Sequence, residues 1–270
     1  AAQIRDALTN GDRAVVLGGG LLGVELADAL NARGVECTIV HRSAHLMGSA
    51  IDETASRILQ EALEERGIGV LLNERILHYH GHERIRAIRT DSGHYMECDT
   101  LIVAAGVVPQ KGLAERAGLR TRHGIVVNHM LQTEDPDIYA IGEVAEFEGK
   151  SIGITSAAQE QARIAAGAIG GFDTVPYKGS IPFSVLKVRG LDLCVIGDAS
   201  TPTSDFESIS LSDVSTHFYK HCVVHRNRLV GAILVGDKTE FPTFLKWIHD
   251  GIELDDLRTR ILRGGGETAV

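Results

Sequence analysis

Three glycines near the N-terminus constrain the fold of this chain more than any other feature. Gly18, Gly20 and Gly23 lie within residues 13–42 in the order G-x-G-x-x-G. An apolar run precedes them, a stretch with helical spacing follows, and a second β-branched run closes the segment. This context predicts a βαβ unit in which the glycines form a tight turn, face a pyrophosphate and pack a helix on a strand. The helix would direct its free N–H groups and its dipole at that phosphate.

Composition excludes several other classes of protein. The 270 residues carry a formal net charge of −9, which argues against nucleic-acid binding because no basic stripe is available to neutralise phosphates. No apolar run reaches membrane-spanning length, and no secretory signal is visible. The four cysteines, Cys37, Cys98, Cys194 and Cys222, are far apart and form no C-x-x-C pair. Cys37, Cys98 and Cys194 lie in apolar runs, where we expect small buried side chains, and a reducing cytoplasm fits best.

The order of apolar patterns along the chain predicts an α/β fold. Asp52 can cap a helix that ends at Gly67, and the next strand is followed by short alternating segments with turn residues between them, as in an antiparallel meander. A buried strand then runs into Gly106, and two short strands precede a helix rich in small residues. The expected ranges are a strand at 68–72, meander strands at 75–80, 84–90 and 94–97, strands at 99–106, 124–128 and 138–142, and a helix at 155–170.

The last third of the chain has an α+β pattern after a linker at 172–179. Arg226-Asn227-Arg228 is typical of a hairpin turn, and the final helix carries the single tryptophan, Trp247. A short polar helix is expected at 1–12 and a frayed tail at 264–267. The expected elements here are strands at 183–188, 191–196, 214–224 and 229–235 and a helix at 241–250.

Three blocks of sequence, in family order, resemble the FAD-dependent pyridine nucleotide–disulfide oxidoreductases. They are Val15 to Glu25, Asp99 to Pro109, and Gly124 to Glu143, so the match covers residues 1–171. Within that family the chain is most similar to the reductase part of the NAD(P)H-dependent nitrite reductase large subunit and to rubredoxin reductase-like enzymes. Leu46-Met47, Gly142-Glu143-Val-Ala-Glu146 and several C-terminal segments carry this closer likeness.

The resemblance implies a Rossmann-like NAD(P)H domain with an antiparallel β-meander at 12–100, the second half of an FAD domain at 101–171, and an α+β C-terminal interface domain at 172–270. It also implies hydride transfer from the nicotinamide to FAD and electron transfer to an acceptor, with cofactors rather than side chains doing the chemistry. The implied NAD(P)H-binding residues are Gly18, Gly20, Leu21, Leu22, Gly23, Glu25, His41, Arg42 and Gly106. Gly142 and Glu143 match the family's flavin-binding Gly-Asp, with Glu in place of Asp.

The chain departs from the family pattern at its beginning. Family members start with a second glycine fingerprint that binds the ADP half of FAD, and only one fingerprint is found here. Three explanations are open: truncation, a split enzyme whose first half is another polypeptide, or a descendant that has lost flavin. We favour truncation because half a sheet leaves open edges, which also predicts a homo-oligomer or another partner chain. Alone, the chain is expected to be inactive.

The choice between the two pyridine nucleotides depends on the end of the second strand. An acidic side chain there binds the ribose 2′-OH of NAD, and a basic one accommodates the 2′-phosphate of NADP. This chain has His41-Arg42 and no acid before Asp52, which favours NADPH. NADH stays open, since a guanidinium can also stack on adenine without contacting a phosphate.

Histidines do not form a predicted metal or catalytic site. His78, His80 and His82 alternate in the meander and could share one face of a strand, a spacing that can bind a transition metal but is more typical of solvated residues. His217, His221 and His225 are expected at a surface or interface. No catalytic side chain is predicted. The alternative to an enzyme module is a flavin-free pyridine-nucleotide-binding or assembly module, and the electron acceptor is not specified by the sequence.

Overall fold

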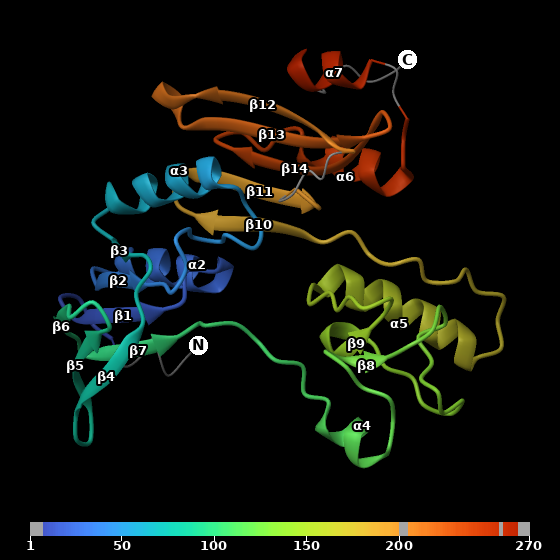
Figure 1. Cartoon of the computed structure of the whole chain (residues 1–270), viewed down its shortest axis with the longest axis horizontal. Helices are drawn as coiled ribbons and strands as arrows, with labels where there is room; N and C mark the ends of the chain where they lie inside the picture. Colours follow the sequence, from blue (N-terminus) through green and yellow to red (C-terminus); the bar gives the residue numbers. More distant parts are fainter. Residues whose placement is uncertain (1–7, 200–204, 254–255, 264–270) are drawn as a thin grey trace. The chain divides into compact units, whose positions relative to one another are not determined.

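The computed structural model describes residues 8–199, 205–253 and 256–263. The chain divides into two compact units, one made of residues up to 106 together with those from 184 onward, and the other of residues 107–183. The short helix expected at 1–12 and the tail at 264–267 fall largely or wholly outside the described residues. The elements of each unit are labelled in Figure 1.

The first unit contains a four-stranded parallel sheet with the strand order β3-β2-β1-β7. Its strands are β1 (Arg13–Leu17), β2 (Glu36–Val40), β3 (Gly69–Leu71) and β7 (Thr100–Val103). The helices α2 (Leu21–Asn31) and α3 (Glu53–Glu64) connect them, and Asp52 caps α3 by accepting a hydrogen bond from the Ala55 N–H at 2.9 Å, as predicted. This is the expected Rossmann-like α/β arrangement.

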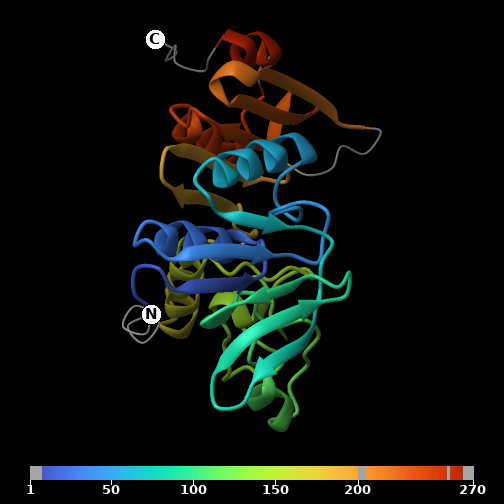
Figure 2. The same ribbon diagram turned by 90° about the vertical axis from the view of Figure 1, so that its left-hand side faces the viewer.

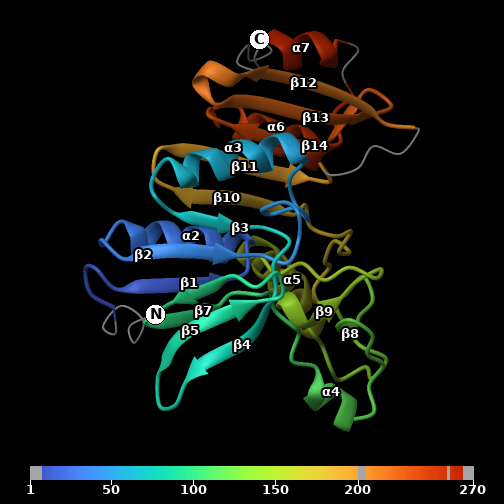
Figure 3. The same cartoon turned by 60° about the vertical axis from the view of Figure 1, so that its left-hand side comes forward.

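The two faces of the parallel sheet pack against different layers because strand side chains alternate. Val16 and Ile39 face α2 and α3, whereas Val15 and Val40 face the meander through Ile88. The meander consists of β4 (Ile76–Gly81), β5 (Ile85–Thr90) and β6 (Tyr95–Glu97), paired antiparallel as predicted. Figure 3 shows β4 and β5 beside β7.

The C-terminal part of the first unit is a five-stranded antiparallel sheet of order β10-β11-β14-β13-β12. Its elements are β10 (Phe183–Val188), β11 (Leu191–Gly197), β12 (Glu207–Asp213), β13 (Phe218–His225), β14 (Arg228–Val235), α6 (Phe241–Asp250) and α7 (Leu257–Arg263). The hairpin turn is confirmed, with positive φ at Arg226 and Asn227. β12 was missed, although Ile209 and Leu211 alternate with serines.

The parallel sheet and the C-terminal sheet share one core. α3 lies between them in Figure 1 and in the rotated view of Figure 2. Leu59 and Leu63 of α3 belong to the same buried cluster as Leu193 and Ile233 of the C-terminal strands. The expected strand at 214–224 begins later, because 214–216 form a 3-10 turn and His217 has a positive φ of 52°.

The second unit is small and is organised around one helix. Its elements are α4 (Gly112–Arg116), β8 (Ile125–Val126), η1 (Gly142–Val144), β9 (Ala145–Glu146) and α5 (Thr155–Ile169). β8 pairs parallel with β9, and Phe147 packs edge-to-face on Tyr177 with centroids 5.0 Å apart. Residues 172–179 form no helix or strand, yet Tyr177 is buried, so this segment is more than a linker.

Two expectations differ from these units. The predicted strand at 138–142 pairs only with residues 131–133, through the bridge from Gln132 to Tyr139 and the backbone hydrogen bonds on either side of it, and this pairing is too short to form a ladder. The expected boundary after residue 100 lies inside β7, which pairs with β1, so the contacts of the first unit extend to Gly106. The functional division at 12–100, 101–171 and 172–270 stays a prediction.

Candidate functional site

The glycine turn connects β1 to α2, and its three fingerprint glycines meet different constraints. Gly18 has φ of 121°, and a Cβ there would lie 2.3 Å from the Ala104 carbonyl oxygen. A Cβ on Gly23 would lie 1.9 Å from the Gly18 carbonyl oxygen, so no side chain fits between helix and turn. Gly20 differs, since its Cβ direction is open space. The turn is therefore closed at Gly18, packed closely against the helix at Gly23, and open on one backbone face at Gly20.

The N-terminus of α2 is open to a ligand. Its N-cap residue is Gly20, which has no side chain to accept hydrogen bonds from the first turn, and that turn contains no acidic residue. The N–H groups of Leu21, Leu22 and Gly23 have no partner within the helix at this position. The Leu22 side chain is 65% exposed beside them. The helix dipole and these donors favour an anion here.

A loop after β2 folds over the glycine turn and holds Gly19 from both sides. The Gly19 N–H donates to His41 Nδ1 at 3.1 Å, and the Met47 N–H donates to the Gly19 carbonyl oxygen at 2.8 Å. A Cβ on Gly19 would lie 2.6 Å from Leu46 Cδ2 and 2.9 Å from His41 Cγ. Gly19 was missed as a site residue, although it stands within the run of three glycines.

His41 and Arg42 occupy the predicted position at the end of β2, but their side chains have different environments. The His41 ring is half-buried, and burial lowers its pKa from the usual value, with the nearby positive charge of Arg42 acting in the same direction. A hydrogen bond with the His45 backbone acts in the opposite direction. Arg42 is exposed and has no acidic partner among the described residues. The first unit thus brings His41 to the glycine turn, and Arg42 follows it in the chain.

Glu25 makes a structural contact that the sequence did not predict. It lies on α2 beyond the first turn, and its Oε1 accepts a hydrogen bond from the Lys187 N–H at 2.9 Å. One turn further along α2, the buried Asp28 accepts from the Arg189 N–H at 3.1 Å and lies 3.4 Å from Arg189 Nε. The two acids therefore attach α2 to β10. The expected contact of Glu25 with the nicotinamide stays a prediction.

Asp52 attaches the end of the same loop to the C-terminal sheet. Its Oδ2 accepts a hydrogen bond from the Tyr219 hydroxyl at 2.5 Å and lies 3.9 Å from His221 Nδ1. His221 Nδ1 is also 2.8 Å from Ser210 Oγ. His221 is buried between the start of α3 and the C-terminal sheet, whereas the sequence predicted a residue at a surface or interface. The loop over the glycine turn is held at both ends.

Tyr219 should make stability fall at alkaline pH. Burial, followed by its hydrogen bond to Asp52, raises the pKa of Tyr219 from 10.0 to about 12. A raised pKa means that the stabilisation is present below pH 10 and is lost as the pH rises through about 12. We expect the free energy of unfolding, measured with urea, to fall more steeply between pH 10 and about 12 in the native chain than in Tyr219→Phe. Tyr79→Phe, at an exposed tyrosine, is the control and should keep the native slope.

Gly106 lies in the first unit, whereas Gly142 and Glu143, which match the family's flavin-binding residues, lie in the second. Gly106 follows β7 in the first unit, with φ of 109° and open space in its Cβ direction. In the second unit Gly142 has φ of 77°, and its N–H donates to Gln161 Oε1 at 2.7 Å. Glu143 is exposed, with its carboxylate against the backbone of Gly153. α5 begins beside this turn without a side-chain cap.

Gln161 holds the Gly142 turn on α5. This buried amide accepts from Gly142 and donates through Nε2 to the Tyr177 hydroxyl at 3.0 Å, and that hydroxyl is 2.9 Å from Ser180 Oγ. Gln161→Leu would remove the partner of the half-buried Gly142 N–H and one of the two partners of the buried Tyr177 hydroxyl. We expect a loss of about 1–3 kcal/mol in the free energy of unfolding, measured with urea. Gln159→Leu on the exposed side of α5 is the control, and an equal loss there would contradict the assignment.

No metal or thiol chemistry is found in the part of the chain that the structure describes. It contains no group of three or more His, Cys, Asp or Glu side chains arranged to hold a metal ion. His78 and His80 are exposed on β4, as expected for solvated residues. The four cysteines are free and buried, and burial raises the pKa of Cys37 and of Cys194 to about 11. These thiols are therefore protonated at neutral pH.

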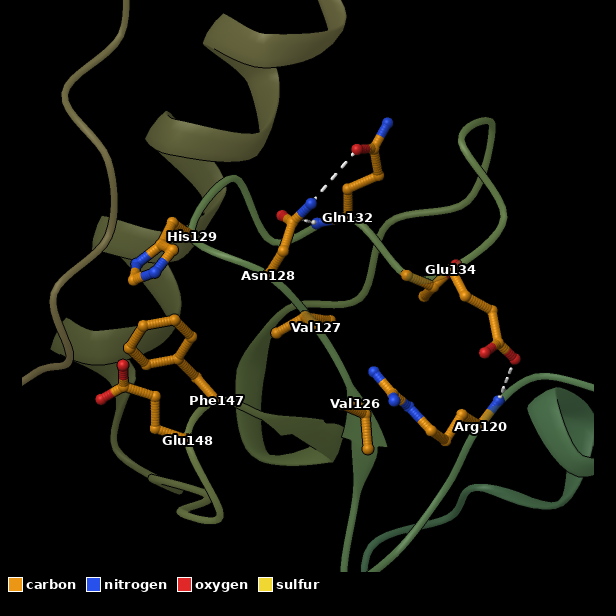
Figure 4. Close-up of a pocket in the computed structure, with 10 residues that line it drawn as sticks. Arg120, Val126, Val127, Asn128, His129, Gln132, Glu134, Phe147 and Glu148 are labelled. Atoms are coloured by element: carbon orange, nitrogen blue, oxygen red, sulfur yellow. Dashed lines mark hydrogen bonds between the residues drawn. The ribbon is translucent and has the colours of Figure 1, made fainter.

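A cavity in the second unit was not predicted from the sequence. It has a volume of about 440 Å³ and is shown in Figure 4. Val127 and Phe147 form part of its apolar lining, and Glu134 accepts a hydrogen bond from the Arg120 N–H at 2.6 Å. None of the predicted cofactor-binding residues lines it.

Among the described helices, none is both long and apolar enough to cross a membrane.

Comparison with protein families identifies the chain. Residues 1–162 match the family described as pyridine nucleotide-disulphide oxidoreductase. The chain belongs to this family. Residues 182–252 also match the family described as rubredoxin NAD+ reductase C-terminal domain. The resemblance inferred from the three sequence blocks is therefore confirmed, and the family uses FAD and NAD(P)H.

Curated relatives include nitrite and rubredoxin reductases. The chain is 36% identical over 244 residues to the nitrite reductase [NAD(P)H] of Bacillus subtilis strain 168, covering 90% of this chain and 30% of that protein. It is 28% identical over 259 residues to the NADH-rubredoxin oxidoreductase of Clostridium acetobutylicum, covering 95% of this chain and 63% of that protein. The chain thus spans less than a third of the nitrite reductase and under two thirds of the rubredoxin reductase.

Solved structures confirm the fold. The putidaredoxin reductase in its covalent complex with putidaredoxin matches with a TM-score of 0.85 at 23% identity, covering 98% of this chain and 66% of that one. The NADH:rubredoxin oxidoreductase of Clostridium acetobutylicum matches with a TM-score of 0.71 at 25% identity, covering 94% and 63%. The parallel sheet, the small antiparallel sheet and the C-terminal antiparallel α+β part are common to this fold.

Proposed function

We propose that this chain is the NAD(P)H-binding and partial FAD-binding module of a flavoprotein oxidoreductase of the nitrite reductase type. The observation that supports the proposal most strongly is the glycine turn, where a helix N-terminus without a cap meets an open backbone face at Gly20. Membership of the pyridine nucleotide-disulphide oxidoreductase family supports the same assignment. Catalysis in the proposal comes from cofactors, and no side chain of this chain is assigned as catalytic.

The residues of the first unit fit a pyridine nucleotide. No side chain fits at Gly18 or Gly23, because its Cβ would clash with a backbone carbonyl oxygen. The Cβ direction of Gly20 is open and leaves room for a phosphate. In the proposal the N–H groups of Leu21 and Leu22 donate to the pyrophosphate, and the helix dipole stabilises its charge. Glu25 and Gly106 would lie toward the nicotinamide. His41 and Arg42 would contact the adenosine ribose, which favours NADPH over NADH.

The residues of the second unit fit part of an FAD site. Gly142 has the positive φ that lets the backbone approach a ligand, and Glu143 is exposed next to it. In the proposal they bind the ribityl and phosphate region, and the uncapped start of α5 lies toward the flavin ring. Bound FAD would accept a hydride from NAD(P)H and pass electrons to an acceptor. The rest of the FAD site is proposed to come from sequence outside this chain or from a partner chain.

Partners and compartment are part of the proposal. We infer an electron acceptor protein or domain as one partner, and a homo-oligomer or a chain that completes the FAD domain as another. A reducing compartment such as the cytoplasm suits four unpaired buried cysteines. Neither nucleic acid nor membrane is proposed as a partner. The alternative function is a flavin-free nucleotide-binding or assembly module, which is favoured by a glycine turn built entirely within the first unit.

Spectroscopy and titration test the proposal on the chain as it exists. We expect NADPH and NADH to bind saturably in a fluorescence titration, whereas purified protein mixed with FAD should show weak or no flavin retention after desalting. The encoding reading frame is checked for a glycine fingerprint upstream of this chain. If none is encoded and the chain binds nucleotide saturably without flavin, the binding module is favoured instead. Failure of both nucleotides to bind at millimolar concentration would overturn both functions.

A further inference from the structure

The interaction between His41 and Gly19 links the nucleotide site to a titratable group. The Nδ1 atom of His41 accepts the Gly19 N–H at 3.1 Å, so this nitrogen carries no proton in the observed arrangement. The other ring nitrogen then carries the proton, consistent with a hydrogen bond to the His45 backbone. The observed state of His41 is therefore the uncharged imidazole, with its ring bridging the glycine turn and the loop that covers it.

Protonation would break this arrangement. An imidazolium is a donor at both nitrogens, and it cannot accept a hydrogen bond from Gly19. The ring also packs directly against Gly19, since a Cβ there would lie 2.9 Å from His41 Cγ and 2.6 Å from Leu46 Cδ2. The charged ring must therefore rotate away from the turn, and it must stay near the end of β2 because its backbone is fixed there. His41 N–H donates to the Leu71 carbonyl oxygen at 2.8 Å, and Glu74 N–H donates to the His41 carbonyl oxygen at 3.0 Å.

The charges around His41 oppose protonation until an anion is present. Arg42 is adjacent in the loop, and the positive end of the α2 dipole lies at the glycine turn. From the segment after β3, Glu74 directs its carboxylate to Ser92 Oγ at 2.5 Å and to His94 Nδ1 at 3.2 Å. A phosphate group beside Arg42 would bring negative charge close to His41 and would favour protonation of its ring. A 2′-phosphate supplies such a charge, and a 2′-hydroxyl does not.

We propose that His41 makes NADPH binding, but not NADH binding, depend on uptake of a proton, and this inference rests on the proposed nucleotide site. The uncharged ring holds the Gly19 N–H in the observed arrangement, and NADH, which has no 2′-phosphate, gains nothing from protonation of His41. The protonated ring releases the Gly19 N–H and stands with Arg42 as a second positive charge for the 2′-phosphate. His41 is thus the residue through which pH sets the preference of the site between the two nucleotides.

The test compares dissociation constants of NADPH and NADH between pH 6 and pH 8.5 for the native chain and His41→Asn. Asparagine offers an acceptor oxygen to Gly19 but cannot take up a proton. We expect the ratio of NADH to NADPH dissociation constants to rise by about three- to tenfold as pH falls in the native chain, beyond any change in the variant. Titration of the 2′-phosphate itself cancels in this comparison. His78→Asn, at an exposed histidine of β4, should behave like the native chain.

A second measurement observes the proton directly. Nuclear magnetic resonance of the histidine ring carbons should contain one signal that is absent in His41→Asn. Its pKa should rise when NADPH is bound and should not rise when NADH is bound. Equal pH dependence of the two nucleotides in the native chain and in His41→Asn, or an unchanged His41 pKa with NADPH, would overturn the inference. Saturable binding of either nucleotide in the same titrations would leave the proposed function standing, and absence of binding by both would refute it first.

Discussion

Gly23→Ala is expected to destabilise the first unit by about 3 kcal/mol and to abolish nucleotide binding. The added methyl group would lie 1.9 Å from the Gly18 carbonyl oxygen, so α2 would have to move away from the turn. That oxygen belongs to the backbone and cannot rotate aside. Movement of the helix would displace the N–H groups that the proposal assigns to the pyrophosphate. Urea denaturation measures the first effect, and fluorescence titration with NADPH measures the second.

Gly20→Ala is the matched control for this substitution. Its new methyl group would meet no atom of the protein within 4 Å, so the free energy of unfolding should change by less than about 1 kcal/mol. The same methyl group would stand on the face that a phosphate approaches, and nucleotide affinity should fall about tenfold or more. A Gly20→Ala chain that binds nucleotide as tightly as the native chain would contradict the proposed position of the pyrophosphate.

Glu240→Met is expected to cost about 3–5 kcal/mol because it leaves a buried ammonium without its counter-ion. Lys220 of β13 is 5% exposed; its Nζ forms an ion pair with the Glu240 carboxylate and donates to the Ile261 carbonyl oxygen at 3.1 Å. The ring centroid of Phe244 lies 5.9 Å from the same Nζ. Lys220 therefore links the sheet to the start of α6 and to α7. Urea denaturation of the full chain measures the cost.

The double variant Lys220→Met with Glu240→Met separates the charge from the packing. Replacement of a buried pair by apolar side chains is often close to neutral, so most of the lost stability should return. Asp192→Asn is the exposed control, since Asp192 pairs with Lys238 at 2.5 Å in contact with solvent and should cost less than about 1 kcal/mol. A double variant as unstable as Glu240→Met would show that the carboxylate acts through packing or helix capping instead.

Much of the local structure could be predicted because it depends on local patterns. The β1–α2–β2 unit follows from glycines at fixed spacing between a strand pattern and a helix pattern, and Asp52 caps α3 because its carboxylate reaches the Ala55 N–H three residues ahead. The meander was visible in alternating segments separated by turn residues. β12 could have been found in the same way, but its serines obscured a short apolar alternation.

Pairing over long distances could not be predicted, because it depends on which segments meet. The expected strand at 138–142 has the composition of a strand, but it pairs only with the short segment 131–133 through a single bridge. The apolar run that forms β7 is compatible with any buried sheet, and only its pairing with β1 places it in the parallel sheet. His221 was one of three histidines with the same spacing, and only the position of α3 against the sheet makes it a buried neighbour of Asp52.

The sequence by itself determined the family and the βαβ unit with its glycine turn, and it predicted the candidate cofactor-binding residues, which stay a prediction. Fixed spacing carries this information, because a turn that leaves no room for a Cβ at Gly18 and Gly23 requires glycine at both places. The tertiary structure alone decided how the site is held. The ring of His41 reaches Gly19 across 22 positions, and Tyr219 reaches Asp52 across 167 positions. Contacts between such distant residues leave no local pattern, since they depend on the packing of whole elements and not on the neighbours of either residue.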